Sequence, residues 1–236
     1  MISLEIALVL ALLAGLSIPL GALISSRSSW ATFCTQRELD SFVTYFGGGA
    51  LLAAISLVLL PRGMESLSVL PAAVAFAFGG LAFWQFSIWA ERTKNTASLF
   101  MGMTLDFLPE AILIGVAAAH NSISAYLLAA LIALQNLPEG FAAHQEMQSS
   151  GISRKHLWLI FLLTPFLGPM SAWVGFAWLS GNEQTLAMVL MFCSGGILYL
   201  IFEDIAPDAR TTGEGFPAVG AIIGFLLGMI GTMLIH

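Results

Sequence analysis

Eight apolar stretches follow one another along the chain, and each is long enough to cross a lipid bilayer. A spanning helix needs about 20 predominantly apolar residues. The stretches cover residues 3 to 26, 41 to 61, 69 to 90, 98 to 120, 123 to 146, 156 to 180, 185 to 206 and 215 to 236. They do not alternate as barrel strands do, so we expect helices. The sequence predicts an all-α integral membrane protein with eight transmembrane helices.

The composition supports a single membrane domain that spans residues 1 to 236. Apolar residues make up 58% of the chain and charged residues 9%, whereas charged residues average about 25% in globular proteins. The first 26 residues lack a basic segment ahead of the apolar run, so we expect a first helix and not a cleaved signal peptide. No stretch between the helices is long enough for a soluble domain.

Basic residues predict the orientation in the membrane. Seven of the eight fall in loops on one side, and the exception is Arg62. The seven are Arg27, Arg37, Arg92, Lys94, Arg154, Lys155 and Arg210. Because basic loops stay in the cytoplasm, we expect a multi-pass protein of the plasma (inner) membrane with both termini outside the cytoplasm. The basic residues are too scattered for a nucleic-acid surface, so the expected partner is the lipid bilayer.

Two motifs place carboxylates inside apolar stretches. They read Asp106-Phe107-Leu108-Pro109-Glu110 and Gln135-Asn136-Leu137-Pro138-Glu139. In each motif two polar side chains are four residues apart, which puts them on one face of a helix. No Lys or Arg occurs between residues 98 and 147 to neutralise them. The prolines cannot donate hydrogen bonds, so we expect free carbonyls and kinks there.

The two motifs are predicted to meet near the bilayer midplane. A very short turn near Asn121-Ser122 would make the two helices an antiparallel hairpin. Counting away from that turn brings Asp106 level with Glu139, and Glu110 level with Gln135. At a rise of about 1.5 Å per residue, these two layers lie roughly 12–18 Å from the cytoplasmic end.

Unpaired charge at this depth is too costly to be incidental. An acidic residue near a helix centre costs roughly 2.5–3.5 kcal/mol, so three would cost about 8–10 kcal/mol if ionised and unpaired. That rivals the 5–15 kcal/mol stability of a typical domain. A metal cation or protons must therefore occupy the site. The alternative is a set of protonated carboxyls that hydrogen-bond between helices.

A weak internal repeat relates the two ends of the chain. The second and seventh stretches align, and so do the first and sixth at Pro19 and Pro169. Partners in each pair run in opposite directions, an inverted topology that is common in secondary transporters. Chance alignment of apolar segments is the alternative. The matched pairs are Phe46 with Phe192, Gly49 with Gly195, Leu52 with Leu198, Ile55 with Ile201 and Pro61 with Pro207.

These residues resemble the ZIP (Zrt/Irt-like protein) family of divalent metal transporters, bacterial type. The second motif, which continues to Gly140, matches the family's Pro-Glu-Gly motif of helix 5. The first motif shares Pro109-Glu110 with the family's motif of helix 4, but it has Asp106 where the family usually has His and Phe107 where the family has Asn. The resemblance implies a 3+2+3 inverted-repeat arrangement with helices 4 and 5 central. It also implies alternating access, with uptake of the metal into the cytoplasm.

Position by position, the resemblance implies a metal site made of Asp106, Glu110, Gln135 and Glu139. Many members of the family have a second metal site next to the first. The corresponding positions in this chain are Phe107, Asn136 and Gly168, and the side chains of Phe107 and Gly168 have no ligand atoms. We therefore expect a single metal site. Weaker candidates for metal binding are Asn136, His144, Glu203 and Asp204.

The predicted ligand set contains oxygen alone. Such a set suits harder cations such as manganese, magnesium or calcium, with iron(II) intermediate, whereas zinc more often takes nitrogen and sulfur. The resemblance implies zinc, iron(II), manganese or a similar divalent ion as substrate, with cadmium included. No His-Glu-x-x-His motif occurs, which argues against an intramembrane metal hydrolase and against an enzyme. The remaining rival is a transporter-derived sensor or scaffold that binds metal without moving it.

Several other polar residues allow two interpretations each. Glu203 and Asp204 are either path residues for the ion or a solvated helix end. His144, five residues past Glu139, is either an exit-path ligand or a cationic group favoured by the helix dipole near a C-terminus. Cys34 and Cys193 fall in different environments, so we expect no disulfide. The oligomeric state stays open, a homodimer included.

Overall fold

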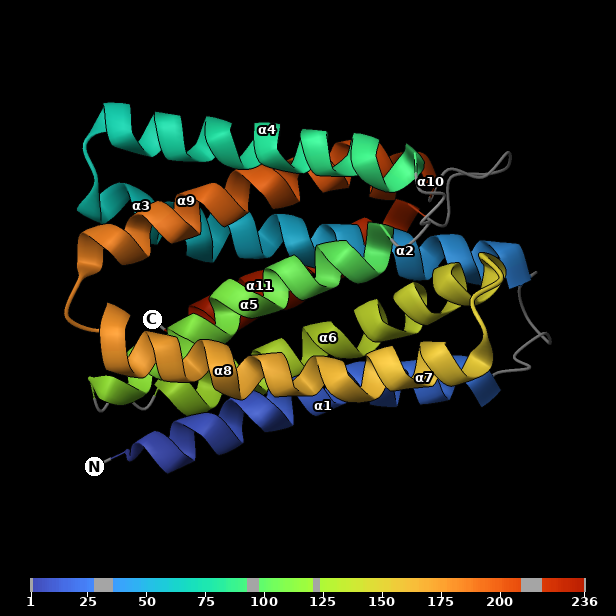
Figure 1. Cartoon of the computed structure of the whole chain (residues 1–236), viewed down its shortest axis with the longest axis horizontal. Coiled ribbons are helices and arrows are strands. Elements are labelled where there is room, and N and C mark those ends of the chain that lie inside the picture. Colours follow the sequence, from blue (N-terminus) through green and yellow to red (C-terminus); the bar gives the residue numbers. More distant parts are fainter. Residues whose placement is uncertain (1, 28–35, 93–97, 121–123, 209–217, 236) are drawn as a thin grey trace.

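The computed structural model describes residues 2–27, 36–92, 98–120, 124–208 and 218–235. Every regular element within these ranges is helical (Figure 1). In chain order the elements are α1 (Leu4–Arg27), α2 (Gln36–Ala54), η1 (Ile55–Leu59), α3 (Leu60–Ser66), α4 (Val69–Arg92), α5 (Ser98–Ala119), α6 (Ser124–Ser149), α7 (Arg154–Leu163), η2 (Thr164–Phe166), α8 (Leu167–Val174), η3 (Gly175–Leu179), α9 (Glu183–Leu200), η4 (Ile201–Ile205), α10 (Ala206–Asp208) and α11 (Val219–Ile235). The all-α prediction is confirmed for this part of the chain.

Six helical segments of the described chain are long and apolar enough to cross a membrane. They are Leu4–Arg27, Ser41–Ser66, Val69–Ile88, Phe100–Ala119, Arg154–Leu179 and Glu183–Glu203. The apolar part of α11, Val219–Leu234, is shorter. Helix α6 has 26 residues but carries Gln135, Asn136, Glu139 and His144, which lower its hydropathy. The structure thus describes a multi-pass helical membrane protein, and the two remaining predicted spans correspond to α6 and α11.

Short irregular turns interrupt three of the longer helical rods. η2 is a 3-10 turn that contains Pro165, whose missing N–H prevents a regular α-helical bond. η1, η3 and η4 are single π-helical turns, a feature that often marks functional regions of helices. η1 begins at Ile55 and η4 at Ile201, the two residues that the sequence alignment matches.

One group of helices is joined through glycine contacts on α1, α5, α6 and α8. A Cβ atom on Gly21 of α1 would overlap the carbonyl of Leu137 on α6, and one on Gly140 of α6 would overlap that of Ile18 on α1. Gly115 of α5 abuts Ala172 of α8 in the same way. Helices α5 and α6 also pack against each other. Small residues let the backbones approach closely, as in other membrane bundles.

A second group is joined in the same manner. Gly49 of α2 abuts the backbone of Ala221 on α11, and Gly224 of α11 abuts that of Phe46 on α2. Gly79 of α4 and Phe192 of α9 make the corresponding contact. In Figure 1, α4, α9 and α2 lie above α5, which crosses the view diagonally, and α6, α8 and α1 lie below it. Helix α5 therefore runs along the boundary between the groups.

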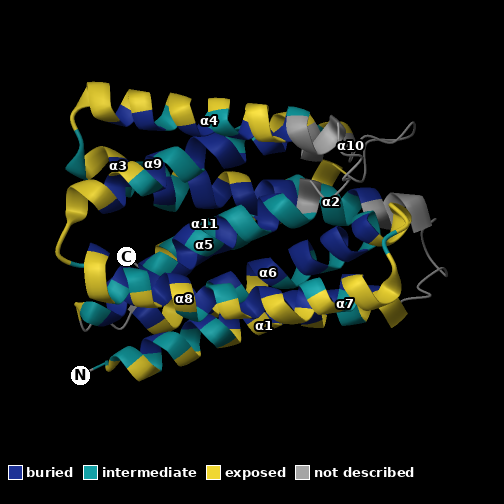
Figure 2. Ribbon diagram, viewed as in Figure 1, coloured by how far each residue is buried: buried dark blue, intermediate teal, exposed yellow. Residues whose placement is uncertain are grey.

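The interior is mainly apolar, but it also contains the buried carboxyl and amide side chains of α5 and α6. The outward face of α4 is exposed along most of its length, whereas α5 and α6 are mostly buried in the centre (Figure 2). Exposed side chains on the outer faces include Phe78, Trp84 and Trp178. Such faces suit a lipid environment. Among the described residues, the buried carboxyl and amide side chains lie on the two central helices.

Candidate metal site

The four residues of the predicted metal site are buried on the two central helices. Their side chains are exposed by 1% at Asp106, 7% at Glu110, 7% at Gln135 and 5% at Glu139. The first two lie on α5 and the other two on α6, each pair one helical turn apart. Pro109 and Pro138 lie within these helices, and helical structure continues past both. The turn near Asn121-Ser122, from which their depths were predicted, lies outside the described residues.

Most polar atoms of this group lack a hydrogen-bond partner. Both carboxylate oxygens of Asp106, both of Glu139, Oε2 of Glu110 and Nε2 of Gln135 are buried without one. Isolated buried charges cost several kcal/mol each after relaxation, and buried polar groups in proteins are nearly always paired. Hydrogen bonding between the helices does not satisfy these atoms. A bound cation or added protons would compensate for their burial.

The three carboxylates are near enough to influence one another. If ionised in the empty site, Glu110 would be repelled by Asp106 and by Glu139, and Glu139 by Asp106. Within the described residues, however, no three His, Cys, Asp or Glu side chains converge closely enough to hold a metal ion as they stand. The carboxylates thus share one region, and a cation would have to draw them together.

The site faces the second group of helices. A small cavity of about 30 Å³ lies between Glu110 and Gln135 on one side and α2, η1 and α11 on the other. Gly47 of α2 lies beside Glu139, where a Cβ atom would be 3.6 Å from Cγ of the glutamate. The carboxylates are therefore positioned at the boundary between the two groups of helices.

Phe107 fills the space beside the site on the α1 and α8 side. Its ring is fully buried. A Cβ atom on Gly168 of α8 would be 2.7 Å from Cζ of the ring, and one on Gly15 of α1 would be 2.9 Å from it. The phenyl ring thus occupies a position where the family resemblance placed a ligand of a second metal site.

Asn136 ties α6 to α1. Its Nδ2 donates to the carbonyl of Ala14 across 3.1 Å, and the side chain has no exposed surface. Its Oδ1 has no partner. The Nδ2 end of the amide therefore links α6 to α1. The Oδ1 end is one more hydrogen-bond acceptor without a partner, on the residue that follows Gln135.

His144 is a buried contact between helices. Its Nδ1 lies 3.0 Å from Oγ of Ser25 on α1, and its ring packs against Trp158 and Phe161. Helix α6 continues to Ser149, so His144 lies more than a turn before the end, and Nδ1 pairs with Ser25 instead of a terminal carbonyl. The structure thus differs from the helix-end interpretation, because α6 extends further than its apolar stretch.

Glu203 is exposed, unlike the four buried residues of the predicted metal site. Glu203 and Asp204 both belong to the π-helical turn η4. The side chain of Asp204 lies outside the described residues, as do Cys34 and Arg210. Both interpretations of Glu203 stay predictions, because an exposed side chain at this end of α9 can face either water or lipid headgroups.

A polar cavity that the sequence reasoning did not identify lies at the end of the bundle where α9 begins. Its volume is about 300 Å³, and its polar lining includes Arg62, Glu65, His120 and Glu183. Nε2 of His120 is 3.1 Å from the carbonyl of Ser180. These residues come from α3, α9 and the end of α5, so no local motif in the sequence could have predicted their meeting.

Comparison with known proteins connects these features to transport. No protein-family model matches the chain. The chain is 30% identical over 249 aligned positions to a protein of Myxococcus xanthus named zinc transporter GufA, with 94% of this chain and 96% of that protein covered. The chain belongs to the ZIP family. A protein of Arabidopsis thaliana named putative zinc transporter is 29% identical over 122 positions, which cover 51% of this chain and 20% of that protein.

Membership in the ZIP family makes this chain a membrane transporter of divalent metal and not an enzyme. Both relatives carry zinc in their names, which agrees with the predicted divalent substrate. The buried carboxylates of α5 and α6 supply donor oxygens of the kind that divalent cations bind.

Proposed function

We propose that the protein moves a divalent metal ion into the cytoplasm through a single site formed by Asp106, Glu110, Gln135 and Glu139. The observation that carries this proposal is the group of buried, unpartnered carboxylate oxygens on α5 and α6. A cation bound there would neutralise their charge and use oxygens that otherwise have no partner. The empty site would be costly, which favours its closure around an ion or a proton.

Zinc is the proposed substrate, with iron(II), manganese and cadmium as competitors. The names of the relatives support zinc. Carboxylate and amide oxygens also bind harder cations well, so we expect broad selectivity. A site that binds weakly can also release its ion on the other side, as conduction and transport require.

A single metal ion is expected because Phe107 blocks the adjacent position. Its ring packs on Gly15 and Gly168 and has no ligand atom. Asn136, the third residue implied for a second site, directs its Nδ2 to α1. Charge compensation would therefore depend on one ion shared by the four residues of the site.

The proposed architecture has eight transmembrane helices in a 3+2+3 arrangement, with α5 and α6 between two inverted repeats. The π-helical turns η1 and η4 support it, since they begin at the matched residues Ile55 and Ile201. The glycine contacts support it further. Gly224 of α11 contacts the backbone of Phe46, and Gly79 of α4 contacts the backbone of Phe192. The two phenylalanines that the sequence alignment pairs therefore each contact a glycine of the adjacent helix.

We propose the plasma (inner) membrane as the location, with both termini outside the cytoplasm. The distribution of basic residues supports this orientation, because Arg154 and Lys155 begin α7 on the side opposite Arg62 of α3. In that orientation the cavity lined by Glu65 and Glu183 faces outward. The lipid bilayer would cover the exposed apolar faces, and a homodimer stays a prediction.

Alternating access would use the boundary between the two helix groups. Within each group, glycine contacts bring backbones together, which favours motion of each group as a unit. The site lies where α5 and α6 face α2 and α11. Movement of the group that carries α5 and α6 would therefore expose the carboxylates first to one side and then to the other.

Uptake by proteoliposomes tests the proposal. We expect zinc uptake by the unchanged protein and its loss in Glu110→Gln and Glu139→Gln, because each replaces a charged ligand by a neutral one of similar size. Glu5→Gln is the matched control, since Glu5 is exposed in the first turn of α1 and belongs to no candidate site, and we expect it to retain uptake. Undiminished uptake in both site variants would refute the site. Zinc binding without uptake in the unchanged protein would favour the sensor.

A further inference from the structure

A second polar cavity lies at the opposite end of the bundle, where α1 and α6 meet the start of α7. Its volume is about 300 Å³, and its polar lining consists of Ser26, His144, Gln148 and Arg154. Among the described residues, no Asp or Glu lines it. Glu146 of α6 is two positions from both His144 and Gln148, which puts it on the opposite side of that helix. The lining therefore carries the positive charge of Arg154 without a carboxylate to balance it.

His144 is the buried member of this lining, with 2% of its surface exposed. Its Nδ1 lies 3.0 Å from Oγ of Ser25, whereas Nε2 has no hydrogen-bond partner among the described residues. When Ser25 donates to Nδ1, Nε2 carries the ring proton and can donate to a ligand in the cavity. The guanidinium of Arg154 adds donors in a geometry that suits phosphate oxygens. The two side chains together favour an anionic ligand.

The first turn of α7 adds to the positive potential. Arg154 and Lys155 begin this helix, and its first turn contains no acidic residue. Ser153, at the N-cap, makes no side-chain hydrogen bond to the backbone of the turn, and its Oγ lies 2.6 Å from Nδ1 of His156 instead. The N-terminus of a helix attracts anions and disfavours basic side chains. An anion in the cavity would compensate for both the free N–H groups and the two basic residues.

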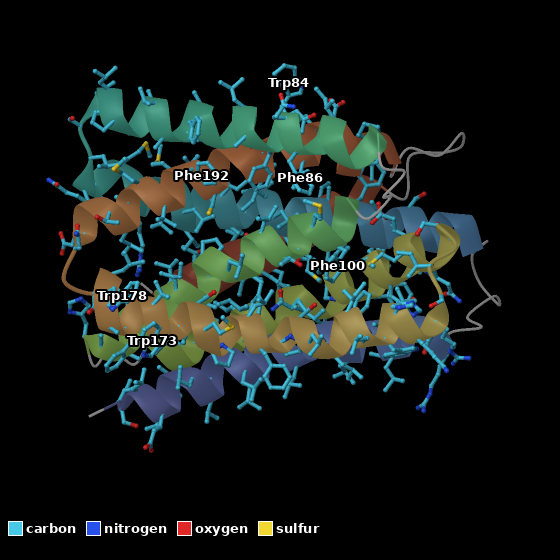
Figure 3. The ribbon with its side chains drawn as sticks, in the orientation of Figure 1. Trp84, Phe86, Phe100, Trp173, Trp178 and Phe192 are labelled. Carbon is cyan, nitrogen blue, oxygen red and sulfur yellow. The ribbon has the colours of Figure 1, made fainter. Side chains whose placement is uncertain are left out.

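Tryptophans place this cavity at the level of the lipid headgroups. Trp158 lines it. Trp178 lies near the other end of the same span, Arg154–Leu179, and packs on Trp173 with ring centroids 5.3 Å apart (Figure 3). Trp158 and Trp178 are 20 positions apart, which corresponds to roughly 30 Å of helix and to the thickness of the hydrocarbon core. Because tryptophan collects at both membrane interfaces, the cavity lies at the depth of the lipid phosphates.

An exposed apolar track continues from the cavity along α7 and η2. Leu162 and Phe166 follow Trp158 at intervals of four residues, so the three share a face, and both are exposed. A free phosphate ion would leave this track uncovered, whereas a lipid acyl chain would cover it. We propose that the cavity binds the phosphate headgroup of an anionic phospholipid, held by Arg154 and His144, with an acyl chain along α7.

The proposed orientation assigns this lipid to the cytoplasmic leaflet, where basic pockets between helices bind anionic headgroups. Lipid binding does not depend on the metal site. A protein that binds the lipid but imports no ion would therefore refute transport and leave the lipid site intact.

Lipid titration of the detergent-purified protein, followed by native mass spectrometry, tests the site. We expect one tightly bound phosphatidylglycerol per chain. Arg154→Gln should weaken this binding roughly tenfold to hundredfold, as expected for the loss of a hydrogen bond from a charged group. Lys155→Gln is the matched control, because it makes the same charge change at an adjacent exposed residue that does not line the cavity. It should weaken binding by about fivefold at most, the effect of one diffuse surface charge.

Four outcomes would overturn the assignment. Equal weakening by Arg154→Gln and Lys155→Gln would mean that the lipid responds to surface charge alone. Phosphatidylcholine bound as tightly as phosphatidylglycerol would remove the preference for an anionic lipid. Inorganic phosphate that displaces phosphatidylglycerol at equal concentration would assign the cavity to a free anion. Unchanged binding in both Arg154→Gln and His144→Phe, which lacks Nε2, would exclude the cavity as the site.

Discussion

The ring of Phe107 on α5 packs directly on Gly168 of α8, where a Cβ atom would lie 2.7 Å from Cζ and 2.6 Å from the carbonyl oxygen of Ala11. Three helices meet at this point without room for a side chain. We therefore expect Gly168→Val to destabilise the protein by about 1–3 kcal/mol, as overpacking does. Thermal unfolding in detergent measures the effect.

Gly181→Val is the control for this prediction, because a Cβ atom at Gly181 would meet no atom within 4 Å. We expect it to unfold at nearly the temperature of the unchanged protein. A smaller loss of stability at Gly168 than at Gly181 would contradict the packing described for Phe107.

Metal stoichiometry follows from the same contact. Phe107 leaves no ligand atoms at its position, so we expect each chain to bind one zinc ion at saturation. Equilibrium dialysis followed by elemental analysis measures the ratio, and Glu139→Gln should lower it toward zero. Two ions per chain, both lost in Glu139→Gln, would show that a second adjacent site exists despite the phenyl ring.

The repulsion among the carboxylates predicts a trade-off between stability and binding. When ionised, Glu110 would be repelled by both Asp106 and Glu139. Replacing it with Gln removes an ionisable group that has too few partners in the metal-free protein, so the metal-free variant should unfold at a higher temperature than the metal-free parent. The stabilisation that zinc gives the parent by binding the folded state should be lost. Thermal unfolding with and without zinc measures both effects, and a metal-free variant less stable than its parent would contradict this account.

The sequence predicted the helices and the four central polar residues because both depend on local patterns. Apolar stretches mark spanning helices, and the i, i+4 spacing of Asp106 and Glu110 fixes their common face. Contacts between distant segments were not predictable in this way. His144 was interpreted from the end of an apolar stretch, whereas α6 extends beyond it.

Adjacent residues of α6 are expected to have different roles. Nδ2 of Asn136 donates to the carbonyl of Ala14, whereas Nε2 of Gln135 has no partner. Asn136→Ala should therefore cost about 0.6–2 kcal/mol of stability, the range for hydrogen bonds between membrane helices, with little change in zinc affinity. Gln135→Ala should lower zinc affinity more than stability. Isothermal titration and thermal unfolding of both variants measure the difference, and a reversed pattern would exchange the two assignments.

His144 is expected to stabilise the contact between α1, α6 and α7 and not to bind the transported ion. Its Nδ1 pairs with Ser25, and its ring packs on Trp158 and Phe161. His144→Phe keeps the ring and loses the hydrogen bond, at a cost of about 1 kcal/mol. His144→Ala also loses the packing and should cost about 2–4 kcal/mol. Thermal unfolding should rank the two variants in this order, with His156→Ala, at an exposed position, as the unchanged control. Zinc uptake measured below the unfolding temperature should have the same KM in both variants. An equal rise of the KM for zinc in His144→Phe and His144→Ala would instead identify His144 as a ligand on the exit path.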